Sequence, residues 1–232
     1  MMNEAERKLC LEIARDKDFL NAFEDAASPY HTITKKVQNG FAEKQLPEPW
    51  NGHLSSAKIM FISSNPSFDK DEPFPNEHWS DNDICDFFHN RFRRQGTPGY
   101  TRYWQYLRKW TNWINARLQP DQEVDYLFKD LDEHIVSTEI VHDKSKGQKG
   151  VPQCIEIEFD KWMSRIISLF NGSVIVVVGG KAAEYLQEIK DIAKLHNNKI
   201  RVIQISHSGE WEKGLTDAKR RQEIDEQFDR TR

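Results

Sequence analysis

Two short polar turns hold the residues of this chain that are best suited to chemistry. The first is Ser63-Ser64-Asn65-Pro66-Ser67, and the second is Ser206-His207-Ser208-Gly209. The amide of Asn65 can donate and accept hydrogen bonds, and the imidazole of His207 changes its charge near neutral pH. Each residue also has an ordinary interpretation, because Asn-Pro commonly opens a turn and a histidine in a loop is usually just solvated. Their positions, each directly after a predicted strand, favour a function for the pair.

Four short apolar runs predict the strands that position these turns. Each run is too short for a typical helix and is rich in branched or aromatic residues, which predicts strands over 58–63, 134–139, 173–178 and 200–205. Helical segments lie between them, so we predict an α/β fold of three layers, α/β/α, with a central four-stranded parallel sheet. Ligands bind at the carboxyl edge of such sheets. That edge would gather both polar turns together with Thr138-Glu139 and Gly179-Gly180.

We predict a single domain over residues 1–232, in which 1–57 form an N-terminal helix and an irregular segment packed on the rest. Apolar spacing predicts that helix over 3–26, whereas scattered proline and glycine residues predict irregular structure over 28–57. A polar loop over 69–83 is long enough to suggest that it serves a site. The helical spacing of apolar residues also predicts further helices over 83–94, 100–120, 153–170, 181–195 and 215–228.

The composition is that of a polar globular protein, with 38% hydrophobic and 30% charged residues and a net charge of −4. No apolar run approaches the length of about 18 residues that a membrane helix requires, so we predict no membrane partner. The three cysteines are far apart in the sequence, which predicts reduced thiols and a cytoplasmic location. Histidine and cysteine spacing matches no metal site, and Gly179-Gly180-Lys181 lacks both common phosphate-binding patterns. We therefore predict no metal and no cofactor, and a tight turn at these glycines.

Cations and aromatic residues are interleaved between positions 89 and 109. Such a mixture can neutralise phosphates while aromatic rings stack on bases, or it can be a solvated charged face over a packed core. The acidic net charge argues against a general nucleic-acid binder. The residues that would contact nucleic acid are Arg91, Arg93, Arg94 and Arg102.

The two polar turns and their strand context resemble the motifs of the uracil-DNA glycosylase superfamily. Members carry a Gly-x-Asn/Asp-Pro type motif after the first strand and commonly His-Pro-Ser after the last strand of a four-stranded parallel sheet. The matching segments here are 63–67 and 206–209, and the likeness runs from about residue 54 to 215. The resemblance implies a DNA partner and hydrolysis of the N-glycosidic bond of a deaminated or damaged base, after the base is flipped from the helix. The iron–sulfur cysteines of some branches are absent.

The resemblance also implies roles for individual residues. Asn65 would position the attacking water, and His207 would donate a hydrogen bond to the base oxygen where negative charge develops. Phe68 or Phe74 would stack on the flipped base. The remaining substrate contacts would come from Ser64, Pro66, Ser67, Glu139 and Ser208.

The chain departs from the family pattern at three positions. Ser63 stands in place of a glycine, Ser208 in place of a proline, and Thr138 or Glu139 in place of an asparagine that reads the base. A carboxylate at this last position would prefer a base edge rich in hydrogen-bond donors, or would repel an anionic leaving base.

Two other hypotheses compete with a glycosylase. One is a non-catalytic protein of the same fold that binds nucleic acid or a nucleotide-like ligand, which Ser208 and Glu139 favour and which Asn65 and His207 oppose. The other is a small-molecule hydrolase of unrelated mechanism, but the chain has no nucleophile-elbow motif and no metal-ligand set.

Overall fold

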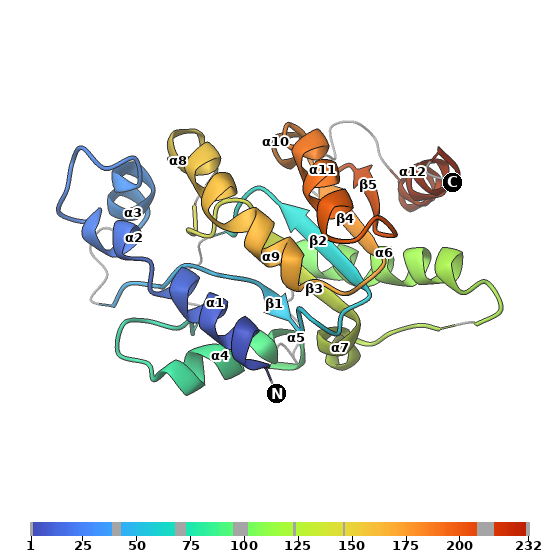
Figure 1. Ribbon diagram of the computed structural model, residues 1–232, viewed down its shortest axis with the longest axis horizontal. Coiled ribbons are helices and arrows are strands. Elements are labelled where there is room, and N and C mark those ends of the chain that lie inside the picture. Colours follow the sequence, from blue (N-terminus) through green and yellow to red (C-terminus); the bar gives the residue numbers. More distant parts are fainter. Residues whose placement is uncertain are drawn as a thin grey trace.

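The computed structural model describes residues 2–38, 43–67, 73–94, 102–122, 124–145, 147–207 and 216–230, which form a mixed α/β fold (Figure 1). The described strands make one sheet in the order β1-β3-β2-β4-β5. Four of these strands pair in parallel, and β1 pairs with β3 in the antiparallel direction. The strands are β1 (Asn51–Gly52), β2 (Ile59–Ser63), β3 (Ile135–Glu139), β4 (Val174–Val178) and β5 (Arg201–Ile205).

Each of the four predicted strands is confirmed within one residue at either end, but the prediction of a four-stranded, wholly parallel sheet is wrong. The fifth strand, β1, has two residues and no apolar alternation, so no sequence pattern identifies it. Its Gly52 has φ +97°, and a Cβ at this position would lie 2.3 Å from the carbonyl oxygen of Ile135. Only glycine therefore lets the chain approach β3 this closely.

The helices mostly follow the predicted segments. The helix expected over 100–120 is α6, and that over 215–228 is α12, whereas the segments 83–94 and 181–195 are each divided into two helices. The helices are α1 (Glu4–Ala14), α2 (Lys17–Asn21), α3 (His31–Gln38), α4 (Asp81–His89), α5 (Arg91–Arg94), α6 (Arg102–Leu118), η1 (Phe128–Asp130), α7 (Leu131–His134), α8 (Val151–Glu158), η2 (Phe159–Met163), α9 (Ser164–Leu169), α10 (Gly180–Ala183), α11 (Leu186–His196) and α12 (Asp217–Arg230).

The N-terminal prediction needs two corrections. The helix expected over 3–26 is divided, because Asp16 has an extended backbone (φ −58°, ψ 120°) and its carboxylate caps α2 by accepting a hydrogen bond from the N–H of Asp18. The segment 28–57, expected to be irregular, contains α3 and β1. A helix of eight residues beside prolines and glycines is too short for its apolar spacing to stand out.

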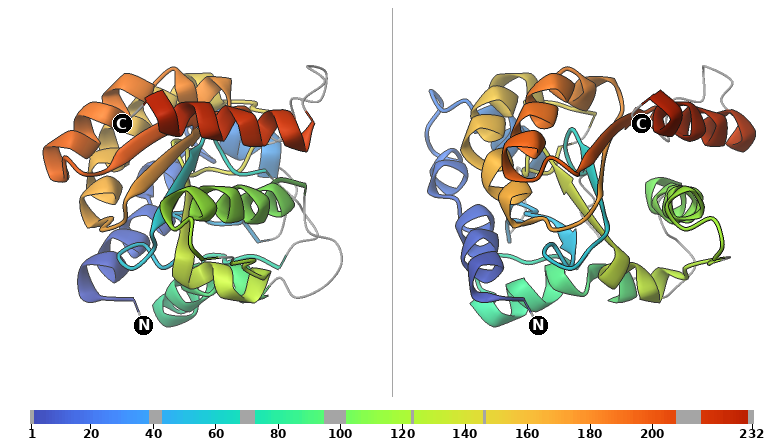
Figure 2. Two further views of the ribbon diagram at one scale, coloured as in Figure 1. Left: turned by 90° about the vertical axis from the view of Figure 1, so that its right-hand side faces the viewer. Right: turned by 45° about the vertical axis from the view of Figure 1, so that its right-hand side comes forward.

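Helices cover both faces of the sheet (Figure 2). One apolar core lies between the sheet and α6 and α12, and includes Phe61, Trp110 and Phe228. The larger core lies on the opposite face, beneath α1, α4, α8, α9 and α11. Alternate residues of each strand supply the two cores, as the pleat requires.

The segment 151–169 is one continuous helical rod, as predicted over 153–170, but its middle turn is a π-helix, η2. Such turns insert one residue into an α-helix and often lie near functional sites.

Candidate functional site

The first polar turn is held in place by the segment that follows β3. Residues 63–67 continue beside residues 140–145 after both strands have ended, and Ser67 pairs with Ser145 in a parallel bridge. The backbone hydrogen bonds run from Ile140 N to Ser63 O (2.9 Å), Val141 N to Ser64 O (3.0 Å) and Ser145 N to Pro66 O (3.0 Å). The two segments are therefore positioned as a unit at the carboxyl edge of the sheet.

Asn65 lies half-buried at this edge. Its Nδ2 donates to the carbonyl of Pro66 (3.0 Å), and its Oδ1 accepts from Ser64 Oγ (3.2 Å). An amide has two N–H donors and an oxygen with two lone pairs, so these local bonds leave hydrogen-bonding capacity for a ligand or water. Pro66 is buried and Ser67 is exposed.

Sequence patterns did not identify Gln148, which reaches the same turn. Its Nε2 donates to Ser64 Oγ at 3.4 Å. Its backbone has φ +58°, a conformation that costs free energy in a residue other than glycine.

His207 lies directly after β5, and α12 holds its backbone. Arg220 donates to the carbonyl of His207 (3.0 Å), while Glu223 accepts hydrogen bonds from both the N–H (3.1 Å) and the hydroxyl (2.8 Å) of Ser206. Gly179 follows the neighbouring strand β4 with φ +85°, and a Cβ there would lie 3.1 Å from the Cβ of His207. The predicted tight turn at this glycine is confirmed, and its lack of a side chain makes room for His207.

Tyr103, in the first turn of α6, lies between the carboxyl ends of β5 and β3. Its ring stacks on that of His207, with centroids 5.6 Å apart and planes at 15°. Burial, and then the nearby charge of Glu139, raise the pKa of Tyr103, whose hydroxyl also lies by Ser63 and Ser137. The hydroxyl is thus a neutral group inside the site.

Glu139, at the end of β3, faces Tyr103 and has only 4% of its surface exposed. Ser63 Oγ donates to its Oε1 at 3.3 Å. Burial, and then the nearby Glu48, raise the pKa of Glu139 well above its ordinary value, which favours the protonated form of this carboxyl. A protonated carboxyl presents one O–H donor beside one acceptor. Thr138 faces away, because its Oγ1 donates to the carbonyl of Pro49 (2.8 Å).

Three polar atoms in this region are buried without a hydrogen-bond partner among the described residues: Tyr103 Oη, Ser137 Oγ and Glu139 Oε2. All three side chains lie on the sheet face that α6 covers. Buried polar groups are normally satisfied, so this cluster can bind further polar atoms.

A second carboxylate, Glu48, completes the site and was not predicted. Asn51 donates to Glu48 Oε1, and Lys144 Nζ lies 3.7 Å from Glu48 Oε2. All three residues are buried. Glu48 stands between two prolines in a segment predicted to be irregular, so no sequence signal indicated that it would face Glu139.

No protein-family model matches this chain, and no curated protein shows significant similarity to it.

The stacking role predicted for Phe74 does not fit its position. The ring is buried in an aromatic cluster with Phe87 and Phe88, and Lys144 Nζ lies 3.3 Å from its centroid. Both contacts favour a packing role for Phe74. The other stacking candidate, Phe68, and the predicted contact Ser208 lie outside the described residues.

All four arginines predicted to contact nucleic acid have contacts within the protein. Arg91 is buried, and its guanidinium lies 4.6 Å from the ring centroid of Phe87. Arg93 Nε pairs with the buried carboxylate of Asp132 (3.1 Å), and Arg94 pairs with Asp86. Arg102 is exposed at the start of α6, and its guanidinium lies 6.0 Å from the ring centroid of Tyr106. This arrangement favours the alternative of a charged face over a packed aromatic core.

The described residues contain no cluster of histidine, cysteine and acidic side chains that could hold a metal ion. Within the same part of the chain, no helix combines the length and the apolar character needed to cross a membrane.

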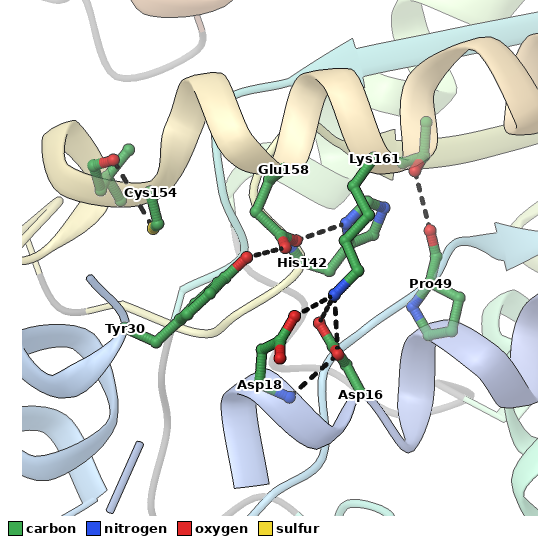
Figure 3. Close-up of polar contacts among 10 residues, drawn as sticks. Asp16, Asp18, Tyr30, Pro49, His142, Cys154, Glu158 and Lys161 are labelled. Atoms are coloured by element: carbon green, nitrogen blue, oxygen red, sulfur yellow. Dashed lines mark hydrogen bonds and ion pairs between the residues drawn. The ribbon is translucent and has the colours of Figure 1, made fainter. Parts of the chain in front are cut away.

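A second buried polar cluster lies on the opposite face of the sheet (Figure 3). Glu158 of α8 accepts hydrogen bonds from Tyr30 Oη (2.7 Å), His142 Nδ1 (3.1 Å) and the backbone N–H of His142 (3.4 Å). Beside it, Lys161 Nζ contacts both carboxylate oxygens of Asp16 at 2.8 Å. Burial by itself would raise the pKa of Glu158, but the hydrogen bonds and the charge of His142, with the Tyr30 bond, outweigh it and lower the pKa.

Proposed function

We propose that this protein is a base-excision glycosylase of the uracil-DNA glycosylase type, built on the three-layer fold of that superfamily. Such an enzyme hydrolyses the bond between a deaminated or damaged base and its deoxyribose. The observation that carries the proposal is that Asn65 and His207 follow parallel strands of one sheet at the same carboxyl edge, with Gly179 making room for the histidine.

The reaction requires a nucleophile at the sugar and a stabilised leaving group. In the proposed mechanism Asn65 orients a water molecule toward the anomeric carbon, the C–N bond breaks and its electron pair leaves with the base. The water oxygen then bonds to that carbon, and the proton that the water loses passes through solvent to the departed base. His207 donates a hydrogen bond to the base oxygen that gains negative charge. A preorganised donor of this kind contributes about 3–4 kcal/mol to lowering the barrier.

Glu139 replaces the asparagine with which many superfamily members read the base. Because burial and Glu48 favour its neutral form, it offers a donor and an acceptor side by side, as an amide does. This removes the repulsion that an ionised carboxylate would exert on an anionic leaving base.

The test is single-turnover excision from single- and double-stranded oligonucleotides that contain uracil, hypoxanthine or xanthine. We expect Asn65→Ala and His207→Ala each to lower the rate by about 100-fold or more. The matched control is His196→Ala, which removes an exposed histidine at the end of α11. Absence of excision by folded wild-type protein on every substrate would reject the proposal.

A second candidate is a non-catalytic protein of the same fold that binds a nucleotide-like ligand. The internal partners of Arg91, Arg93 and Arg94 favour it, because they leave fewer cations for a DNA backbone. Fluorescence anisotropy with labelled DNA at about 50 and 200 mM salt separates the two, since phosphate contacts make DNA affinity fall steeply with salt. Calorimetry with deoxyuridine monophosphate tests the small ligand directly.

A further inference from the structure

Tyr103 differs from the rest of the helix that carries it. The apolar side of α6 packs on the sheet through Leu107, Trp110 and Ile114, all of which are buried. This agrees with the packing role that the aromatic spacing predicts. One turn earlier, Tyr103 instead contacts residues at the carboxyl ends of two strands.

The ring of Tyr103 is fixed on two sides. It stacks on His207, and it meets Trp110 edge-on, with centroids 6.2 Å apart and planes at 75°. Gly179 approaches the Cβ of the same histidine. His207 is thus restrained at its ring by an aromatic residue and at its Cβ by a backbone turn.

The hydroxyl end of Tyr103 reaches the other side of the site. It is buried beside Ser63, Ser137 and Glu139. In the sheet order, β5 and β3 are separated by β4 and β2. One side chain therefore bridges the ends of two strands that do not touch.

We propose that Tyr103 is a positioning residue, whose ring sets the orientation of the His207 imidazole while its hydroxyl lies beside Glu139 in the same site. The consequence for catalysis rests on the proposed function, whereas the restraint on His207 does not.

The restraint is tested by NMR of protein labelled at histidine, because a stacked ring shifts the resonances of its neighbour. We expect Tyr103→Phe, which keeps the ring, to leave the His207 ring-proton resonances near their wild-type positions, and Tyr103→Leu to move them downfield. The matched control is Tyr106→Phe. Tyr106 lies one turn after Tyr103 on α6, and its hydroxyl donates to Asp217. Nuclear Overhauser contacts between the two rings in the wild-type protein give a test that needs no variant.

The excision assay tests the catalytic consequence. We expect Tyr103→Leu to lower kcat by about 100-fold with KM little changed, because a misplaced group loses rate more than binding, and Tyr103→Phe to lower it less. His207 resonances that stay in place in Tyr103→Leu, together with no contact between the wild-type rings, would overturn the proposal. If Tyr103→Leu moves the His207 resonances but the wild-type protein excises no base, the glycosylase function is rejected and the positioning role of Tyr103 is kept.

Discussion

Glu139 and Glu158 are two buried carboxyl groups on opposite faces of the same sheet, and their surroundings differ sharply. Glu158 is 2% exposed and Glu139 is 4% exposed, but from the described residues Glu158 accepts three hydrogen bonds and Glu139 accepts one, from Ser63. The pKa of Glu158 is lowered and that of Glu139 is raised. Burial raises the pKa of both, so the difference comes from their neighbours: hydrogen-bond donors and the charge of His142 beside Glu158, and the acidic Glu48 near Glu139.

Glu158 is a carboxylate whose hydrogen bonds are made within the protein, whereas Glu139 is only partly satisfied there. A satisfied buried network stabilises and fixes the packing around it, while a partly satisfied one is costly unless something else completes it. The carboxylate of Glu158 is of the first kind, although His142 Nε2 and Asp143 Oδ2 beside it are buried without a hydrogen-bond partner among the described residues. The region around Glu139 is of the second kind, and it lies where parallel sheets bind ligands.

The largest effect that we predict comes from removing the satisfied carboxylate. Glu158→Ala leaves the hydroxyl of Tyr30 and Nδ1 of His142 buried without their acceptor, so the free energy of unfolding should fall by about 4 kcal/mol. Urea denaturation measures it. Glu156→Ala, at an exposed position of the same helix, is the control, and an equal loss in both variants would show that the network is not stabilising.

Two tyrosine hydroxyls provide a paired test of the same contrast. Tyr30→Phe removes the donor to Glu158 Oε1 and should cost about 2 kcal/mol, because the acceptor is charged and buried. Tyr103→Phe removes a hydroxyl that has no partner among the described residues and should cost less than about 0.5 kcal/mol. Thermal or chemical unfolding of the two variants side by side measures the difference. A larger loss in Tyr103→Phe would reverse our assignment of the two clusters.

The raised pKa of Glu139 predicts a pH effect of definite sign. The folded protein retains a proton that the unfolded chain loses above about pH 4.5, the ordinary value, so this group lowers stability as the pH rises from there toward its folded pKa. Glu139→Gln cannot ionise and should gain stability relative to wild type over that range, with little difference below it. Denaturation curves from pH 4 to pH 9 measure the gap. A gap that stays constant with pH would mean that Glu139 titrates normally.

The smallest effect that we predict is the contribution of Glu48 to the raised pKa of Glu139. After burial, Glu48 is the next largest cause of the upward shift, so Glu48→Gln should lower the pKa of Glu139 without bringing it to the ordinary value. Carbon-13 NMR of the side-chain carboxyl groups follows the titration, with Glu156→Gln as the control. An unchanged titration of Glu139 would place the origin of the shift in burial alone.

The sequence predicted what depends on local pattern. Apolar runs located the strands β2 to β5, and their ends placed Asn65 and His207 at one edge. Glu48 was not predicted, because its proximity to Glu139 depends on the two-residue strand β1 adding to β3. Tyr103 was not predicted either, because its helical spacing is that of its packed neighbours.

The hydrogen bonds of Glu158 could not be predicted from the sequence for a similar reason, because they join residues that are far apart in the chain. Tyr30 and Glu158 are separated by 128 positions, and their contact depends on where α8 lies over the sheet. No periodicity in the chain carries that information.

The π turn at 159–163 sets the phase between the two α-helical parts of the rod that carries Glu158. Each residue of an α-helix turns the chain by about 100°, so deletion of one residue in this turn would rotate α8 against α9 by roughly that angle. Glu158 would then leave Tyr30 and His142, even though no residue of the network had changed. Insertions and deletions in this stretch should consequently be tolerated far less well than substitutions of its exposed side chains.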